Sequence, residues 1–328
     1  GSEMCIRDSA GDKPTRRGAI SAPLYDTPRA VSTGPNWAYL RIAEGCDNRC
    51  AYCVIPSLRG KFRSRTKESI LEEARLLAAS GVKELIIVAQ DITRYGIDLY
   101  GKVCLTELLK ELCKLDFRWV RLHYLYPELI DDELIDEIAS EDKIVKYLDI
   151  PIQHINDTIL RRMNRRGTGE EIRALFKKLR ERIPGLVLRT SLITGLPGEG
   201  EAEFEELCDF LREAKIERAG VFPYSPEEGT PAALMPDRCS TEEAQRRAEL
   251  CMEIQAEIMD GFAETFIGRE LDVLVMGREP DGTPWGRSEY DSPDIDSRVI
   301  FSGDAAPGDM VRVRIDSVDD GELIGEQI

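Results

Sequence analysis

The sequence predicts an α/β protein in which a partial, TIM-like (β/α)6 barrel precedes a small antiparallel β-barrel. Up to about residue 264, short apolar runs alternate with helical patterns, which is typical of a parallel sheet covered by helices. Beyond residue 265, short β-rich runs are separated by Gly, Pro and Asp, which predicts a barrel of OB-like size. We therefore expect a disordered or extended leader or cloning remnant over residues 1–35, a core domain over 36–264 and a small domain over 265–328.

Six strands are expected in the core domain, whereas a complete barrel of this type needs eight. They are Ala38–Ile42, Glu84–Ala89, Trp119–Tyr124, Tyr147–Ile152, Leu186–Ile193 and Arg218–Phe222. In such barrels the functional residues gather at the carboxyl ends of the strands, because the loops there vary without disturbing the core. We expect the functional site at that end of the sheet.

Three helices between these strands carry clear start signals. Thr66 is placed to cap a helix, and Thr168 with Glu171 forms a capping-box pattern. Ser240 and Glu243 repeat the capping box before a long helix. The apolar stripes of these helices predict packing against the core.

The small domain is expected to contain five strands and to be acidic. The strands are Glu270–Met276, Pro284–Glu289, Arg298–Phe301, Met310–Ser317 and Leu323–Glu326. Residues 265–328 hold six arginines, no lysine and fifteen acidic residues, a formal charge of −9. A domain that holds RNA is expected to be basic. The charge therefore disfavours RNA binding and suits a basic protein partner.

Composition and charge narrow the class of protein. The 328 residues are 42% hydrophobic and carry a net charge of −17, which indicates a globular protein with little general affinity for nucleic acid. Acidity that serves solubility alone is the alternative. No apolar run reaches the length of a membrane span, and the nine cysteines show no paired secretory pattern. We expect a cytoplasmic protein that makes no use of a membrane.

Cys46, Cys50 and Cys53 form the most informative motif, directly after the first expected strand. Their spacing suits a loop that holds three irons of an iron–sulfur cluster, whereas four cysteines are the common arrangement. The fourth iron is then open to a small molecule, as a catalytic zinc keeps one position open. A structural zinc needs a second close pair of ligands, which the chain lacks, and buried inert thiols are the other alternative.

Two segments offer polar groups at expected strand ends. Residues 191–199 form a Gly/Pro-rich turn that allows close approach of a ligand, although a plain connecting loop has the same composition. Residues 149–154 end the fourth strand with His154, for which a loop histidine bonded to backbone is the alternative. Two histidines in the chain are too few for a histidine-rich metal site.

Charged runs flank these segments. Arg59, Arg63 and Arg65 follow the cysteine loop and suit a substrate carboxylate or, equally, a solvated surface. The acidic stretch 199–213 contains an apolar stripe, which predicts an ordinary exposed helix.

With Tyr52 before the last cysteine, the triplet resembles the Cys-x-x-x-Cys-x-aromatic-Cys signature of the radical S-adenosylmethionine (SAM) superfamily. The resemblance implies a [4Fe–4S] cluster held by the three cysteines, with SAM chelating the open iron. One electron from the cluster then cleaves SAM to a 5′-deoxyadenosyl radical. The resemblance leaves the catalytic residues unassigned and implies cofactor contacts by Tyr52, Gln153, Arg189, Ser191 and Gly195.

From about Trp37 onward the chain resembles a methylthiotransferase of the RimO branch that ends in a TRAM domain. Residues 88–96, 151–157 and 290–296 carry this resemblance. It implies transfer of a methylthio group to the β-carbon of an aspartate on the twelfth small-subunit ribosomal protein, with SAM as radical source and methyl donor. The alternative is a MiaB-like enzyme that modifies an adenosine in transfer RNA, and the acidic small domain favours the first reading.

The resemblance also implies partners and a departure from the family pattern. The partners are a basic ribosomal protein and an electron donor such as flavodoxin or ferredoxin. Relatives carry an N-terminal domain with three cysteines for a second cluster, whereas only Cys5 precedes Cys46 here. We therefore expect this chain to bind one cluster and cleave SAM without completing sulfur insertion.

Overall fold

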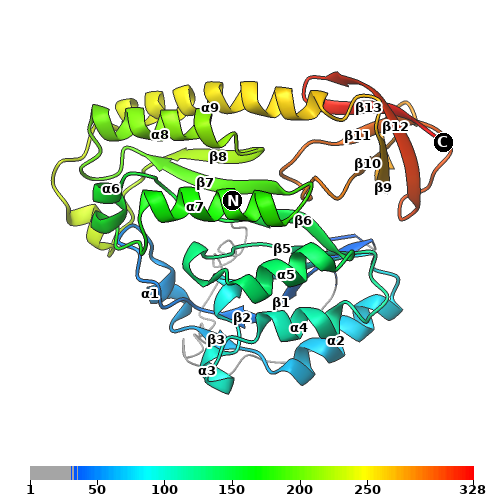
Figure 1. Ribbon diagram of the computed structural model, residues 1–328, viewed down its shortest axis with the longest axis horizontal. Helices are drawn as coiled ribbons and strands as arrows, with labels where there is room; N and C mark the ends of the chain where they lie inside the picture. The colour runs from blue at the N-terminus through cyan, green and yellow to red at the C-terminus, as the bar shows by residue number, and fades with distance from the viewer. Residues whose placement is uncertain (1–30, 32, 35) are drawn as a thin grey trace, which may run out of the picture.

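The structure is a computed structural model that describes residues 31, 33, 34 and 36–328, so the leader expected over residues 1–35 lies almost wholly outside the described residues. Six strands form one parallel sheet in the order β1-β4-β5-β6-β7-β8 (Figure 1). They are β1 (Trp37–Arg41), β4 (Glu84–Val88), β5 (Trp119–Leu122), β6 (Ile144–Asp149), β7 (Val187–Thr194) and β8 (Arg218–Pro223). Spatial order follows chain order, which confirms the partial (β/α) barrel.

Helices between the strands pack on one face of this sheet (Figure 1). The longer ones are α2 (Lys67–Ala79), α4 (Leu105–Leu112), α5 (Asp132–Ser140), α7 (Gly169–Arg182), α8 (Glu201–Ala214) and α9 (Thr241–Glu264). The short ones are α1 (Ile55–Arg59), η2 (Ile92–Arg94), α3 (Ile97–Tyr100), η3 (Pro127–Leu129), α6 (Asp157–Arg162) and η4 (Pro231–Leu234). Side chains alternate along a strand, so Leu40 of β1 and Leu85 and Ile87 of β4 face the helices in the main core, where all three are fully buried.

The predicted helix starts are largely confirmed. The Thr66 side chain caps α2, and Thr168 forms a reciprocal capping box at α7. At α9 only half of the box is present, because Ser240 accepts from the Glu243 N–H while the Glu243 carboxylate pairs with Arg247 at 2.8 Å.

Five predicted core strands match to within two residues at each end, but the fourth prediction was displaced. The strand β6 spans Ile144–Asp149 and not Tyr147–Ile152. Pro151 has no N–H for the ladder, so the regular strand ends before it. Gln153 then takes a positive φ of 72° and forms an isolated parallel bridge with Leu192, so only this residue beyond β6 pairs again with β7.

The C-terminal domain is a closed barrel in the order β10-β11-β13-β12-β9. Its strands are β9 (Glu270–Arg278), β10 (Pro284–Arg287), β11 (Val299–Ser302), β12 (Met310–Asp319) and β13 (Glu322–Gln327). Four neighbouring pairs are antiparallel as predicted, but β11 and β13 run parallel. A closed ring with an odd number of strands cannot alternate throughout, so at least one pair must be parallel.

The inner face of the parallel sheet is charged at the amino-terminal ends of its strands. Glu84 of β4 accepts from Arg121 Nε of β5 at 2.6 Å, and both side chains are fully buried. Arg287 of β10 reaches the other oxygen of the same carboxylate at 2.5 Å. Burial opposes ionisation of Glu84, but the two guanidinium groups outweigh burial and lower the pKa of its carboxyl.

The loop after β10, residues 288–297, fills the adjoining interior and is called the plug segment below. Its Asp291 accepts from Arg218 of β8 at 2.8 Å, and its Asp296 accepts from the Tyr147 hydroxyl of β6 at 2.6 Å. The small domain is therefore anchored inside the larger barrel by buried polar pairs. Among the helices of the described residues, none combines the length and the apolar character needed to span a membrane.

We predict that Glu84→Gln lowers the free energy of unfolding by about 3–5 kcal/mol, because two buried guanidinium groups lose their shared negative charge. Since the folded-state pKa of Glu84 is depressed, the stabilisation is present above the ordinary glutamate pKa and is lost as the pH falls below that range. Chemical unfolding of both proteins at about pH 7 and at steps down to about pH 2, well below the ordinary glutamate pKa, measures the difference.

The control for this prediction is Glu72→Gln, on the exposed surface of α2. It is expected to change the free energy of unfolding by no more than about 0.5 kcal/mol. Equal effects of the two substitutions would contradict a shared buried ion pair.

Candidate active site

The cysteine loop follows the first strand at the carboxyl end of the sheet. Cys46, Cys50 and Cys53 all carry free thiols, and Cys50 is buried. The Cys46 N–H donates to Gly60 O at 3.1 Å, and the Cys53 N–H donates to Cys50 O at 3.0 Å. The strands β2 (Ala43–Glu44) and β3 (Arg63–Ser64) pair at the base of the loop and hold its two ends together.

The loop after β4 supports the cysteine loop from the side. Gly45 donates its N–H to Gln90 Oε1 at 2.6 Å, and Asn48 Nδ2 donates to the buried Asp91 carboxylate at 3.0 Å. Gly45 has a φ of 84°, and an added Cβ would lie 2.2 Å from Lys61 O. Only glycine fits this position, so the backbone of the loop is fixed immediately before its first cysteine.

Tyr126 and Arg165 lie against the thiol of Cys50. The Tyr126 hydroxyl is 3.1 Å from Cys50 Sγ, and Arg165 Nη1 approaches the same sulfur at 3.9 Å. Arg165 also donates to the Tyr126 hydroxyl and, at 2.7 Å, to Pro151 O. Within the described ranges no carboxylate forms an ion pair with this buried guanidinium. A buried charge needs an opposite charge nearby, so this site suits an anionic group at Cys50.

The thiols themselves suit a cluster. Burial raises the pKa of Cys46 to about 11 and also raises the pKa of Cys53, so both are protonated until a cation binds. Metal ions deprotonate the thiols that ligate them. In the part of the chain that the structure describes, no three His, Cys, Asp or Glu side chains converge on a single metal ion. Three separate thiols on one loop, one of them beside a buried cation, fit an iron–sulfur cluster, in which each cysteine binds a different iron.

The structure brings Gln153 and Ser191 together at the carboxyl ends of β6 and β7. The Gln153 N–H donates to Ser191 O at 2.9 Å, and Gln153 O accepts from the Ile193 N–H at 2.8 Å. Arg189, two residues earlier on the same face of β7, pairs with the buried Asp149 at 2.9 Å. These predicted cofactor residues therefore share one side of the barrel mouth.

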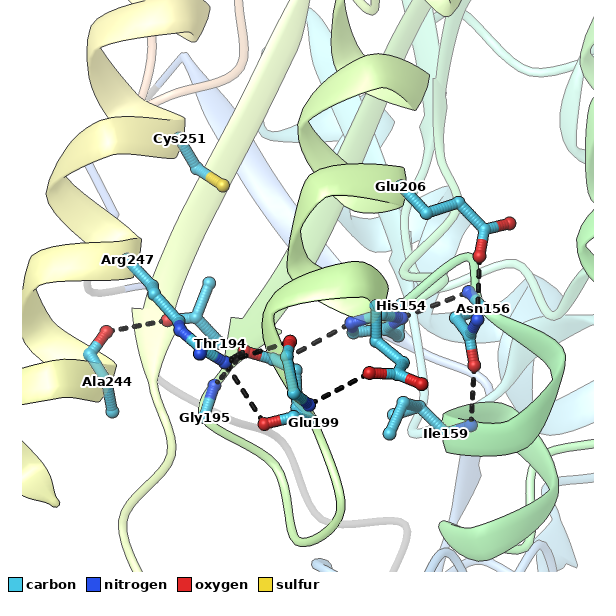
Figure 2. A network of polar contacts seen from close by, with 12 residues as sticks. His154, Asn156, Ile159, Thr194, Gly195, Glu199, Glu206, Ala244, Arg247 and Cys251 are labelled. Atoms are coloured by element: carbon cyan, nitrogen blue, oxygen red, sulfur yellow. Dashed lines mark hydrogen bonds and ion pairs between the residues drawn. The ribbon is translucent and has the colours of Figure 1, made fainter. Parts of the chain in front are cut away.

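A buried polar network stands behind this mouth (Figure 2). Glu199 Oε1 accepts from the Gly195 N–H and from Arg247 Nη1 of α9, each at 2.8 Å, while its Oε2 lies 3.3 Å from His154 Nε2. Because His154 Nδ1 accepts from the Asn156 N–H at 3.0 Å, a neutral ring carries its proton on Nε2, which faces Glu199. Burial opposes ionisation of Glu199, but these donors lower the pKa of its carboxyl.

The network joins three elements that are distant in the sequence. His154 and Asn156 follow β6, Glu199 follows β7, and Arg247 projects from α9 (Figure 2). Gly195 is explained by packing, because an added Cβ would lie 2.4 Å from Ala244 Cβ of α9. The Gly/Pro-rich turn thus serves the close approach of α9, and the predicted ligand contact at Gly195 has its N–H already engaged.

Comparison with known proteins identifies the family. Residues 40–211 match the radical SAM superfamily, and residues 267–328 match the TRAM domain. The ribosomal protein uS12 methylthiotransferase RimO of Caldanaerobacter subterraneus is 49% identical over 302 residues, which cover 91% of this chain and 69% of that protein. Its counterpart in Pelotomaculum thermopropionicum is 52% identical over 312 residues, which cover 93% and 70%. The chain belongs to the RimO family.

Solved structures agree with this fold. Coproporphyrinogen III oxidase HemN of Escherichia coli, a radical SAM enzyme, superposes with a TM-score of 0.52 at 20% identity and covers 69% of this chain and 54% of its own. The methyltransferase TsrM of Kitasatospora setae, with cobalamin and a [4Fe–4S] cluster bound, gives 0.50 at 20% identity, with 60% and 38% covered. The predicted membership of the RimO branch, with its TRAM domain, is confirmed by the relatives above.

The three arginines predicted to bind substrate in this RimO-family chain have different surroundings. Arg65 is held by Glu73 at 2.5 Å and by Arg41 O at 2.9 Å, with a side chain only 9% exposed, so it ties the loop to α2 and is not available to substrate. Arg63 donates to Arg59 O and to a second carbonyl of the same turn. Arg59 is 53% exposed and lies 3.4 Å from Glu44, so it is the most exposed of the three beside the cysteine loop.

Sequence reasoning missed two residues of the RimO-family site and misjudged a third. Arg165 lies in the connection between α6 and α7 and Arg247 lies in α9, each next to a second arginine, and no local pattern distinguishes them from surface residues. Glu199 was grouped with an exposed acidic helix, whereas it precedes α8 and is buried. Its place directly after the Gly/Pro-rich turn was the available signal.

We predict that Arg247→Met lowers the free energy of unfolding by about 3 kcal/mol, because Glu199 would keep its charge without its guanidinium partner. Urea unfolding followed by circular dichroism measures the change. Arg246→Met is the matched control, since the neighbouring Arg246 is half-exposed and, among the described residues, pairs only with Glu243 one turn away. The control is expected to stay within about 0.5 kcal/mol, and a loss as large as that of Arg247→Met would contradict the buried network.

Proposed function

We propose that the chain serves radical SAM methylthiotransfer to the β-carbon of an aspartate on ribosomal protein uS12, with the cleavage of SAM as the step that its own residues carry out. One observation supports this most strongly: one loop carries three free thiols, and one of them, Cys50, lies 3.9 Å from a buried guanidinium that forms no ion pair with the described residues, in a chain half identical to RimO proteins. The alternative is a MiaB-like enzyme acting on transfer RNA. The charge of −9 on residues 265–328 argues against that substrate.

In this proposal Cys46, Cys50 and Cys53 hold a [4Fe–4S] cluster and leave one iron open. Arg165 balances the negative charge of the ligated sulfurs, and the Tyr126 hydroxyl donates to Cys50 Sγ once that thiol is deprotonated. When bound, the cluster and SAM supply a one-electron cleavage that removes a hydrogen atom from the substrate carbon. The burial of Cys50 keeps water away from the ligated sulfur.

The proposed contacts to SAM are Tyr52, Gln153, Ser191 and Arg189. Tyr52 packs beside Cys50 among Ala51, Met163 and Leu196, which gives an apolar wall for a nucleoside. Gln153 presents its side chain from a turn fixed by the two backbone bonds to β7. The buried Glu199 network behind this turn orients it and excludes water.

We also propose a flavodoxin or ferredoxin as electron donor, and a basic ribosomal protein as the partner whose aspartate is modified. Arg59 is the substrate contact retained from the sequence prediction, since it is exposed next to the cysteine loop. A guanidinium there suits a carboxylate of the substrate.

Cys46→Ala, Cys50→Ala and Cys53→Ala are each expected to abolish both the visible absorbance of the reconstituted cluster and the formation of 5′-deoxyadenosine from SAM and dithionite, because each removes one of three iron ligands. Iron analysis, absorbance and chromatography of the product measure these losses. Cys113→Ala, at the buried end of α4, is the matched control and is expected to retain both. A chain that keeps its cluster without Cys50 would contradict the assigned ligands.

Tyr126→Phe is expected to lower the reduction potential of the cluster by an amount on the order of tens of millivolts, because a hydrogen bond to a ligating sulfur stabilises the reduced state. Potentiometric titration followed by electron paramagnetic resonance measures it. Tyr224→Phe is the control, since this buried hydroxyl has no partner within the described residues. Equal potentials in the two variants would contradict a bond to Cys50.

A further inference from the structure

A cleft of about 410 Å³ lies between the barrel mouth and the plug segment. We call it the interdomain cleft. Tyr39, Gln90, His123 and Tyr124 line it from the core domain, and Pro293–Ile295 line it from the plug segment. A site between two domains is a common place for a ligand to bind.

The interdomain cleft adjoins the proposed reaction centre. Gln90, on its wall, accepts the N–H of Gly45, which is bonded directly to Cys46. The cleft therefore extends from the plug segment to the residue that holds the backbone next to the first cysteine. A chain segment lying in it would be in contact with both domains at once.

The TRAM side of the cleft is rigid. Ser292 Oγ lies 3.0 Å from His123 Nε2, and the Ser292 N–H donates to Asp296 at 2.8 Å. Asp296 is itself held by the Tyr147 hydroxyl at 2.6 Å. The short stretch between Ser292 and Asp296 is thus pinned at both ends, which fixes the direction of its exposed side chains before any ligand binds.

One carboxylate in the cleft stands apart from the others. Asp294 is exposed, has a φ of 66°, and forms no ion pair or hydrogen bond with the described residues. Two arginines also line the cleft, but both are paired with other carboxylates: Arg41 with Glu44 at 2.6 Å and Arg189 with Asp149 at 2.9 Å. Asp294 therefore offers an uncompensated negative charge on the wall of the cleft.

Apolar side chains flank this charge. Ile295 of the plug segment is 53% exposed and Tyr124 at the end of β5 is 46% exposed. Exposed apolar groups beside a fixed charge are typical of a surface that receives a peptide.

We infer that the interdomain cleft holds the segment of the protein substrate around the target aspartate, and that Asp294 pairs with a lysine or arginine next to that aspartate. This inference rests on the proposed function and adds the residue that selects the amino-acid sequence of the substrate. Ile295 and Tyr124 contact the apolar parts of the same segment. The charge of −9 on the TRAM domain attracts a basic protein from a distance, whereas Asp294 acts at contact range.

The test uses the reconstituted full chain and a fluorescent synthetic peptide in which an aspartate is flanked by lysine and arginine. Asp294→Asn is expected to weaken binding of this peptide about five-fold, as anisotropy titration measures it, because one contact between opposite charges is lost. Asp320→Asn is the matched control. It is an exposed aspartate with a φ of 48° in the turn between β12 and β13, and its affinity is expected to equal that of the wild type.

A charge swap provides the second arm. In a peptide whose basic residues are replaced by glutamate, Asp294→Lys is expected to bind at least about three times more tightly than the wild type, while Asp320→Lys is not. Equal binding by the Asn variants, together with no gain in the swap, would overturn the inference while leaving the proposed function intact. Failure of the wild-type chain to bind the basic peptide would overturn both, and thermal unfolding of each variant shows that the fold is retained.

Discussion

One buried carboxylate ties the two domains together. Glu84 of the barrel accepts from Arg121 of the next strand at 2.6 Å and from Arg287 of the TRAM domain at 2.5 Å. An eight-stranded barrel fills its interior with layers of apolar side chains, whereas this six-stranded one carries charges on its inner face. Buried charges persist only when they are paired, so each cation on the strands demands an anion. The plug segment supplies such an anion to Arg218, and charge pairing thereby sets where the TRAM domain lies.

The same pairing shapes the surface of the cleft. Asp291 and Asp296 point into the barrel and are committed to Arg218 and Tyr147. Asp294 lies between them in the sequence, with a left-handed backbone and an exposed side chain. Three acids in six residues therefore have two roles: the outer two anchor the loop, and the middle one is presented to a ligand. An unanchored loop would bind a ligand more weakly, because binding would first have to order the loop.

Most of the fold could be predicted from local sequence patterns. The features that could not be predicted depend on contacts between residues that are distant in the sequence. Strand alternation, helix caps and the cysteine spacing depend on residues within one turn or one strand, so they can be read along the chain. The contacts between Arg165 and Cys50 and between Arg287 and Glu84 join residues 115 and 203 positions apart. The sequence around an arginine is the same in kind whether the arginine lies on the surface of a helix or in a buried pair. The displaced fourth strand shows the opposite case. Pro151 is a local signal for the end of a strand, but the apolar run around it favoured a strand that continues through it.

The arrangement of charge also distinguishes the two candidate substrates, because transfer RNA is negatively charged and a basic ribosomal protein is positively charged. At Cys50 a buried guanidinium faces the thiols, so this end of the site favours an anionic cluster. At the far end of the interdomain cleft, the uncompensated Asp294 and a TRAM domain of charge −9 repel phosphates and attract cations. A nucleic acid would have to lay its backbone across this acidic domain to bring a base to the cysteine loop. A basic protein segment meets favourable charge along the same path, so the electrostatics that hold the domains together also favour a protein substrate.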